Sequence, residues 1–367
     1  NRCAECHRAG EAAPMSLVTY AEVRPWAKAI QERVLEGKMP PWPASPKHGS
    51  FLNDRRLSER EIATVVEWVK AGAPEGDARE LPPPPKFESG WMMGKPDAVF
   101  ELPSENDVPA EGVVAYQHFT VDPRFDEDKW VQAAEIRPGN RGVVHHIIVF
   151  VRPPGAESNE ATPAVRTGRD YHLVGFAPGE QPKVYQPGTA KLVKAGSKLV
   201  FQVHYTPNGK AAKDRSRVGF LFAKAAPAHE AHTSMALNAR FAIPAGAANH
   251  EVTSTWTAKE DVRLERFMPH MHLRGKDFKY TAVFPDGRSE VLLEVPKYDF
   301  NWQLMYVLKE PLRLPKGTRI DCVAHFDNSA NNKYNPDPMK EVRWGPQTWE
   351  EMMIGWFDYT TERRTNE

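Results

Sequence analysis

The residues best suited to redox chemistry include a cysteine pair near the start of the chain. Cys3, Cys6 and His7 form a CxxCH pattern, in which the two thiols can bond to haem vinyl groups while the histidine binds the iron. A structural zinc site is the alternative, but it needs four ligands, and the chain offers no second cysteine pair. The motif therefore predicts one covalent haem c, attached through Cys3 and Cys6.

A haem that transfers electrons needs a second axial ligand, usually a methionine or a histidine. Met39 lies in the segment KMPPW, residues 38–42, which we expect to form a loop between two helices. Met15 and His48 are rival candidates. We predict that His7 and Met39 are the axial ligands of the haem iron.

Two helices are expected to surround this haem. Thr19 with Glu22 and Ser58 with Glu61 have the spacing of capping boxes, which mark helix starts. Apolar residues follow each pair at helical spacing, and Gly72 is typical of a helix end. The stretch 1–77 resembles a class I cytochrome c, which implies a small all-α domain. Because such domains normally carry a helix before the CxxCH, we expect an upstream segment that includes an export signal.

The histidines of the remaining chain gather in three strand-like runs. His145 and His146 lie in VVHHIIVFV, and His204 lies in LVFQVHYTP. His270 and His272 lie in FMPHMHLRG, and they can grip one metal because residues i and i+2 of a strand share a face. Adjacent histidines point to opposite faces of a regular strand. His145 and His146 can therefore bind one metal only where the strand is twisted or bulged.

A methionine pair supplies a further candidate ligand. Met352 and Met353 lie in the strand-like run WEEMMIGWFDY. Imidazole suits copper, zinc, iron and nickel, whereas a thioether favours copper(I) over zinc. From these residues alone, a histidine-rich zinc hydrolase and a redox or copper-binding module without oxygenase activity both stay open.

The elements that must position these ligands are strands. From about residue 97 the chain alternates short apolar runs with turns, and the sequences PNG at 207–209 and PDG at 285–287 are hairpin signals. The expected strands include 113–121, 131–136, 143–151, 199–205, 218–222, 278–284 and 291–295. A proline-rich linker over residues 78–96 precedes them.

The composition limits the classes of partner. Lys plus Arg and Asp plus Glu both number 48, which argues against nucleic acid and against charge-driven binding to anionic lipid. No apolar run approaches the roughly 20 residues of a membrane helix, so no membrane span is expected. The 367 residues suggest two or three domains, at roughly 150 residues per domain.

The histidine and methionine motifs occur in a characteristic order along the chain. The succession HH, QVHY, HxH and EEM, over residues 97–367, resembles the type II copper, ascorbate-dependent monooxygenases, which include peptidylglycine α-hydroxylating monooxygenase and dopamine β-monooxygenase. The resemblance implies two tandem antiparallel, jelly-roll-like all-β sandwiches, over 97–225 and 226–367. Each sandwich would hold one copper, and the two would face each other across a solvent cleft.

The resemblance also implies the metal ligands, whereas the residues that bind substrate differ from those of the family. The implied ligands are His145, His146 and His204 for the first, electron-transfer copper and His270, His272 and Met352 for the second, oxygen-activating copper. Met352 is preferred over Met353 because the family pattern ends in an acidic residue followed by Met. An arginine and a tyrosine that hold the substrate in the peptide-hydroxylating branch are replaced here by Met268 and Trp356, which implies a more apolar or aromatic substrate pocket.

Three other residues have weaker signals. His325 and Asp327, in AHFDNSANN, are candidates to orient ligands of the second copper, with an ordinary polar turn as the alternative. Cys322 is expected to be a small buried residue.

We therefore expect a copper-dependent monooxygenase that hydroxylates a small organic substrate with dioxygen. Its electrons would pass through the fused haem c, from an ascorbate-like reductant or a redox protein. The haem c places the protein outside the bacterial cytoplasm, so a periplasmic or secreted bacterial protein is expected. The alternative is a haem/copper electron-transfer or copper-binding protein.

Overall fold

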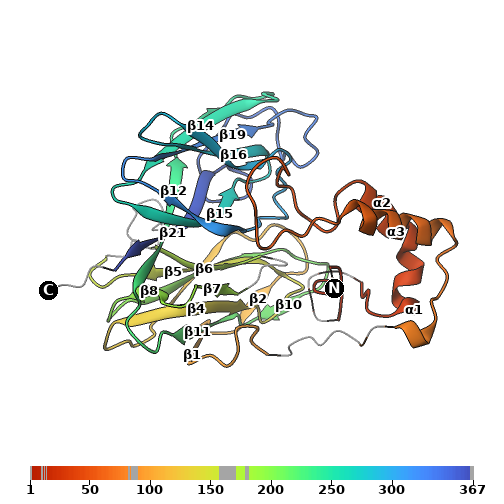
Figure 1. Cartoon of the computed structure of the whole chain (residues 1–367), viewed down its shortest axis with the longest axis horizontal. Helices are drawn as coiled ribbons and strands as arrows, with labels where there is room; N and C mark the ends of the chain where they lie inside the picture. Colours follow the sequence, from red (N-terminus) through yellow and green to blue (C-terminus); the bar gives the residue numbers. More distant parts are fainter. Residues whose placement is uncertain are drawn as a thin grey trace. The chain divides into compact units, whose positions relative to one another are not determined.

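The chain forms two compact units. The structure, a computed structural model, describes residues 2–9, 11, 13, 15–81, 83, 90–156, 171–177 and 182–363. The first unit comprises residues 1–42 and 53–90, and the second comprises residues 43–52 and 91–367 (Figure 1).

The first unit contains the predicted helix starts. Its elements are α1 (Tyr20–Val23), η1 (Arg24–Trp26), α2 (Ala27–Leu35), α3 (Glu59–Lys70) and η2 (Ala78–Glu80). Both capping boxes are present: the Thr19 side chain accepts from the backbone N–H of Glu22, and the Ser58 side chain accepts from that of Glu61. Gly72 follows α3 with φ +89°, a backbone conformation that glycine adopts without steric cost. The local helix signals are therefore confirmed.

The prediction of a small all-α cytochrome c domain over residues 1–77 is wrong. The chain is 41% strand and only 9% helix, and α3 buries none of its residues, while α2 buries only Ala27 and Val34. Residues 36–58, which include four prolines, contain no helix, and residues 43–52 belong to the second unit. Capping boxes specify where a helix begins, because they act on adjacent N–H groups. They do not supply the shared apolar core that an all-α domain needs.

The second unit begins with a β-sandwich. Its strands are β1 (Ala98–Glu101), β2 (Asn106–Val108), β3 (Gln117–Val121), β4 (Lys129–Arg137), β5 (Val144–Arg152), β6 (Tyr171–Phe176), β7 (Lys183–Val184), β8 (Thr189–Val193), β9 (Lys198–Tyr205), β10 (Ala212–Asp214) and β11 (Arg217–Phe222). One sheet has the order β1-β11-β4-β8 with β7 beside β4, and the other has the order β3-β9-β5-β6. Strands β2 and β10 pair separately.

A second sandwich follows in sequence. Its strands are β12 (His229–Asn238), β13 (Ala242–Ile243), β14 (His250–Thr257), β15 (Val262–His270), β16 (Gly275–Val283), β17 (Ser289–Val295), β18 (Tyr306–Leu314), β19 (Arg319–Phe326), β20 (Val342–Arg343) and β21 (Met353–Glu362). The strands β12-β21-β15-β18, in this order, form one layer, and the sheet β14-β19-β16-β17 forms the other. Strand β13 pairs with β20. A parallel contact between β8 and β12 joins the two sandwiches through one continuous nine-stranded sheet (Figure 1).

The sandwich cores explain why these runs form strands. In the first sandwich, Val131 and Phe220 of one sheet pack against Ile147 and Phe201 of the other, and all four are buried. In the second, Tyr280 donates a hydrogen bond to the Trp356 carbonyl across the core. Alternate residues of each strand face these cores, which is the period that the sequence carries.

Two local predictions in this unit are confirmed, the hairpin at residues 285–287 and the burial of Cys322. Gly287 has φ +87° in the hairpin between β16 and β17, and Cys322 is only 1% exposed, packed close to Gly355. Within the expected linker over 78–96, Trp91 packs beneath Arg137 and Arg217 of the first sandwich. Residues 84–89 of that linker lie outside the described residues.

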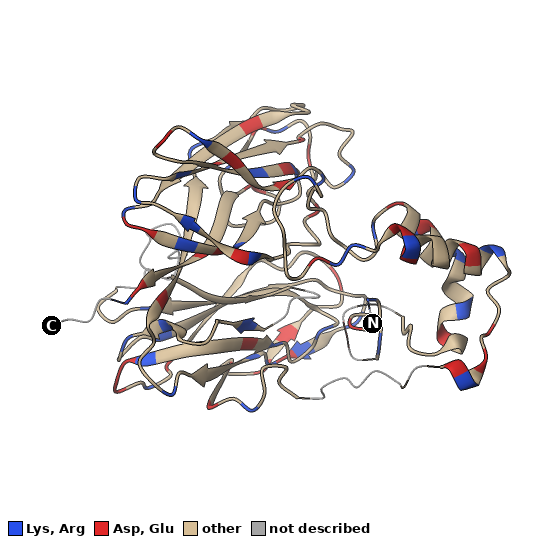
Figure 2. Cartoon of the chain, viewed as in Figure 1, with Lys and Arg blue, Asp and Glu red and all other residues tan. Residues whose placement is uncertain are grey.

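Charged residues of both signs are interspersed along the elements of each unit (Figure 2). In the described part of the chain, no helix combines the length and hydropathy needed to cross a bilayer.

Candidate metal centres

A β-bulge brings the adjacent histidines of β5 to one side. The pairing of β5 with β9 shifts register between Val144 and His146, so that His145 is the extra residue of the bulge. His146 then lies directly opposite His204. His145 Nδ1 and His146 Nδ1 are 3.1 Å apart, which a regular strand does not allow for neighbouring side chains. The structure thus supplies the distortion that the sequence reasoning required.

His145, His146 and His204 form a compact group of nitrogen donors. One ring nitrogen from each lies within 4.8 Å of the others. His146 Nε2 and His204 Nδ1 are buried and have no hydrogen-bond partner in the described part of the chain. Burial lowers the pKa of His145 to about 4 and that of His204 to about 3, so both imidazoles are neutral at pH 7, the form that binds metal. This arrangement can hold a metal ion through three imidazoles.

The HxH histidines are both buried at the end of β15. His270 and His272 are 7% and 0% exposed, and their ring centroids are 5.2 Å apart. His270 Nδ1 lies 2.7 Å from Gln303 Oε1, and His272 Nδ1 lies 3.2 Å from the Glu350 carbonyl oxygen. Both Nδ1 atoms face oxygen acceptors, so Nδ1 carries the proton and Nε2 keeps its lone pair. His272 Nε2 is buried without a partner.

Glu351 joins this strand end to the methionine ligand candidate. Its side chain is fully buried, and Oε2 accepts from the backbone N–H groups of His272 at 2.8 Å and Met352 at 3.3 Å. Oε1 accepts from the Arg274 N–H at 2.6 Å. Burial raises the pKa of Glu351 to about 8, while these N–H groups act in the opposite direction. One carboxyl group therefore fixes the two segments that carry the second set of candidate ligands.

The structure separates the two neighbouring methionines. Met353 is fully buried, and its sulfur accepts a hydrogen bond from the Ser254 hydroxyl at 3.2 Å. Met352 is only partly buried, and it precedes Ile354, the residue paired with His270, by two positions. Met352 directly precedes β21 and packs against the cluster that contains Ile354, the residue opposite His270. Of the two, Met353 has its sulfur engaged by a hydroxyl, whereas Met352 lies beside the strand end that carries His270.

Two aromatic rings lie between the two groups of histidines. The Tyr116 ring centroid is 4.6 Å from that of His204 and 6.4 Å from that of His272. The Phe300 ring stacks on His145 at 5.3 Å and lies 6.0 Å from His272. The two groups of histidines therefore share aromatic neighbours.

Met268 and Trp356, the expected substrate-pocket residues, lie opposite each other on β15 and β21. They belong to a buried apolar layer formed by Phe150, Val200, Met268, Ile354 and Trp356, with Met235, Met305 and Met352 among the residues packed against it. The apolar layer joins β5 and β9 of the first sandwich to β15 and β21 of the second. It borders the His270 end of β15 directly.

His325 and Asp327 have other partners. His325 Nδ1 is 2.7 Å from Asp277, and its Nε2 is 3.4 Å from Glu251. The Asp327 carboxylate accepts from Ser329 in a turn. The residues that contact the ligand histidines are instead Gln303, Glu350 and Glu351, together with Asn301 beside His145. Sequence reasoning missed these four because no motif marks them, although the acidic residue before Met352 was part of the family pattern.

The CxxCH residues form one tight turn in the first unit. The N–H groups of Cys6 and His7 both donate to the Cys3 carbonyl, at 3.2 and 2.9 Å, which brings positions i, i+3 and i+4 to one side. Both thiols are free, and burial lowers the pKa of His7. Met39 belongs to the same unit and follows α2, whereas His48 belongs to the second unit and faces Glu294 at 3.8 Å.

Comparisons with known proteins assign no family. No family model and no curated protein matches the chain. Among solved structures, infectious bursal disease virus Gx strain gives a TM-score of 0.23 at 6% identity, covering 73% of each chain. The VP2 subviral particle of the same virus gives 0.23 at 9% identity over 73% of each chain. The A223 turret protein of Sulfolobus turreted icosahedral virus gives 0.15 at 8% identity, covering 71% of this chain and 98% of that one. Scores at this level do not bear on function.

Proposed function

We propose that this protein is a copper-dependent monooxygenase of the type II, ascorbate-dependent kind, which hydroxylates a small organic substrate with dioxygen. The observation that carries the proposal is the convergence of His145, His146 and His204 beside a second, separately held pair, His270 and His272. A single site would serve a structural metal or a hydrolase. Two neighbouring sites with different donor sets suit a reaction that needs two electrons.

The residues fit copper at both positions. Three neutral imidazoles suit copper(II) and copper(I), and the set of His270, His272 and Met352 adds a thioether that favours copper(I). Bound copper would supply one-electron transfer at the first site and activation of dioxygen at the second. The buried, unpartnered nitrogens His146 Nε2, His204 Nδ1 and His272 Nε2 support this, because unsatisfied buried polar atoms are costly without a ligand.

The chain's own side chains can organise the reaction. Gln303 and the Glu350 carbonyl orient His270 and His272, and Glu351 holds His272 beside Met352. The apolar layer next to the second site can receive the substrate carbon and exclude water.

A covalent haem c on Cys3 and Cys6 fits the turn that brings these thiols beside His7. When bound, it would supply one-electron transfer from an external donor, with Met39 as our proposed second ligand. Haem c is attached outside the bacterial cytoplasm, so we place the protein in the periplasm or outside the cell. Acid–organic extraction of the purified protein should leave the haem absorbance on the polypeptide. Complete extraction of the haem would contradict covalent attachment.

Metal content and oxygen consumption test the main proposal. Natively loaded protein should contain two coppers, and the reduced protein should consume dioxygen only when substrate is present. Met352→Leu removes the thioether at nearly constant volume and should abolish hydroxylation, whereas Met353→Leu, the matched control, should retain it. Unchanged product formation by Met352→Leu contradicts the assigned oxygen-activating site. Zinc instead of copper would favour a hydrolase, and copper without oxygen consumption would favour an electron-transfer protein.

A further inference from the structure

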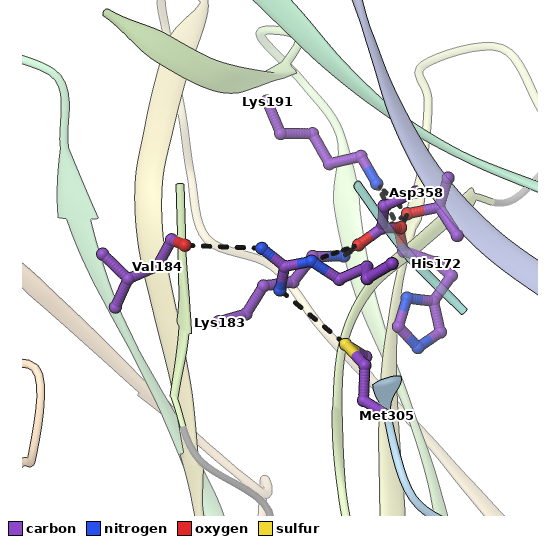
Figure 3. A network of polar contacts seen from close by, with 8 residues as sticks. His172, Lys183, Val184, Lys191, Met305 and Asp358 are labelled. Atoms are coloured by element: carbon purple, nitrogen blue, oxygen red, sulfur yellow. Dashed lines mark hydrogen bonds and ion pairs between the residues drawn. The ribbon is translucent and has the colours of Figure 1, made fainter. Parts of the chain in front are cut away.

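A buried cluster of cations lies further along the strands that carry the second site. Lys183 on β7, Lys191 on β8 and Arg266 on β15 surround the carboxylate of Asp358 on β21 (Figure 3). Lys183 Nζ is 2.8 Å and Arg266 Nε is 3.4 Å from Asp358 Oδ2. All four residues are buried: the side chains of Lys183, Arg266 and Asp358 are 3%, 8% and 5% exposed, and 3% of the surface of Lys191 is exposed. We call these four residues the cation cluster.

Hydrogen-bond donors outnumber acceptors in the cation cluster. Lys191 Nζ uses two of its three hydrogens, on the His172 carbonyl and the Thr233 hydroxyl, both at 2.6 Å. Besides the ion pair of its Nε with Asp358, Arg266 donates to one carbonyl, that of Val184 at 3.4 Å, and to one weak acceptor, the Met305 sulfur, although its guanidinium carries five N–H groups. The surplus calls for an additional acceptor.

Two further polar groups beside the cation cluster have no partner. Among the described residues, both ring nitrogens of His172, which is 2% exposed, are buried without a hydrogen bond, and so is the hydroxyl of Tyr185, which is 3% exposed. The Tyr185 ring lies under Lys183 and Arg266, at 5.5 and 5.6 Å. The His172 ring contacts Trp356 of the apolar layer, with 5.5 Å between centroids.

The positive charge of the cation cluster exceeds its negative charge. Within the described residues, Asp358 is the only carboxylate that forms an ion pair with these cations. Glu265 and Glu230 act on them only at longer range. Burial lowers the pKa of Lys191, and the charge of Lys183 lowers it further. Uncompensated charge in a protein interior is costly, so a buried anion would stabilise this arrangement.

The strand register connects the cation cluster to the second metal site. On the pair β15–β21, Arg266 lies opposite Asp358, Met268 opposite Trp356, and His270 opposite Ile354. Alternate residues of a strand share a face. Arg266 of the cation cluster, Met268 of the apolar layer and the proposed metal ligand His270 therefore follow one another along one face of β15. His270 is four positions beyond Arg266 on an antiparallel strand, a distance of about 14 Å.

We propose that the cation cluster, with His172 and Tyr185, binds the carboxylate of an elongated amphiphilic acid whose apolar body lies along the Met268–Trp356 layer. This inference rests on the proposed function for what then happens at the far end: the carbon held beside His270 and Met352 is the one hydroxylated. The substrate class is thus a medium-chain or aryl-alkyl monocarboxylic acid rather than a wholly apolar molecule.

Calorimetric titration of the oxidised holoprotein, without reductant, tests the binding separately from turnover. Octanoate should bind at least about tenfold more tightly than methyl octanoate, because the ester cannot form charge-assisted hydrogen bonds. Octanoate should also bind more tightly than acetate, which lacks the apolar body. Equal affinity for octanoate and its ester, equal affinity for octanoate and acetate, or no binding along the series hexanoate, octanoate and decanoate overturns the proposal.

Variants locate the site. Lys191→Met keeps an unbranched side chain about one atom shorter, removes the amine and should remove the preference for acid over ester. Lys198→Met, which removes an exposed lysine paired with Asp122, is the control and should keep it. His172→Phe provides a second variant in case Lys191→Met does not fold, and it should weaken octanoate binding. A preference unchanged in the folded variants contradicts the site. Octanoate binding without oxygenation would leave this inference standing while the proposed function fails.

Discussion

Glu351→Gln should destabilise the protein and loosen the proposed second metal site together. A carboxyl group offers lone pairs on both oxygens, whereas an amide accepts only at one. If the amide oxygen takes the position of Oε2, the N–H groups of His272 and Met352 keep their acceptor, and the Arg274 N–H faces an NH₂ group. One buried donor then loses its partner, which costs about 1–3 kcal/mol. The opposite orientation leaves two donors unsatisfied, so this range is the smaller of the two costs.

Chemical denaturation of the metal-free protein at a pH above the Glu351 pKa of about 8, where both oxygens are acceptors, measures this loss. Glu350→Gln is the matched control, because the neighbouring side chain accepts from the Gln347 N–H and its backbone carbonyl, which contacts His272, is unchanged. We expect the control to lose about 1 kcal/mol or less. X-ray absorption of the copper(I) form should show a weakened copper–sulfur contribution in Glu351→Gln alone. A stability loss below about 0.5 kcal/mol, within the range of ordinary surface changes, would refute the reasoning.

Three further predictions concern charge and metal. Asp358→Asn leaves buried cations unpaired and should lower the free energy of unfolding by about 3–5 kcal/mol, whereas Asp122→Asn at an exposed ion pair should leave it unchanged in the same denaturation assay. Burial acts to raise the pKa of Asp358, but Lys183 and its neighbouring cations outweigh it and hold the pKa below the usual value. The stability from Asp358 should therefore be present above about pH 4 and be lost as the pH falls below it; a wild-type acid profile identical to that of Asp358→Asn would contradict this. Copper should raise the melting temperature of the metal-free protein by binding the folded state, and His204→Ala should reduce that rise; an equal rise in both would exclude His204 as a ligand.

Local signals in the sequence predicted local structure well. The capping boxes at Thr19 and Ser58 act on the next three residues, and the glycine of the PDG hairpin has the positive φ that its turn requires. The period-two runs likewise became strands at nearly the expected bounds, because side-chain alternation decides which face of a strand is buried. Local signals do not predict the architecture of the first unit. Its helix starts are correct, but α3 buries no residue, so the helices do not form the core of an all-α domain.

The sequence by itself determined which residue types can bind metal and on which strands they lie. It left open whether His145 and His146 could act together, and only the pairing of β5 with β9 introduces the bulge that turns both to one side. The partners that orient His270 and His272 come from segments 33 and 78 residues away, so no local pattern reveals them. Tertiary structure decides such features because hydrogen bonds and burial depend on which strands meet, whereas helix caps and strand periods depend on residues adjacent in the chain.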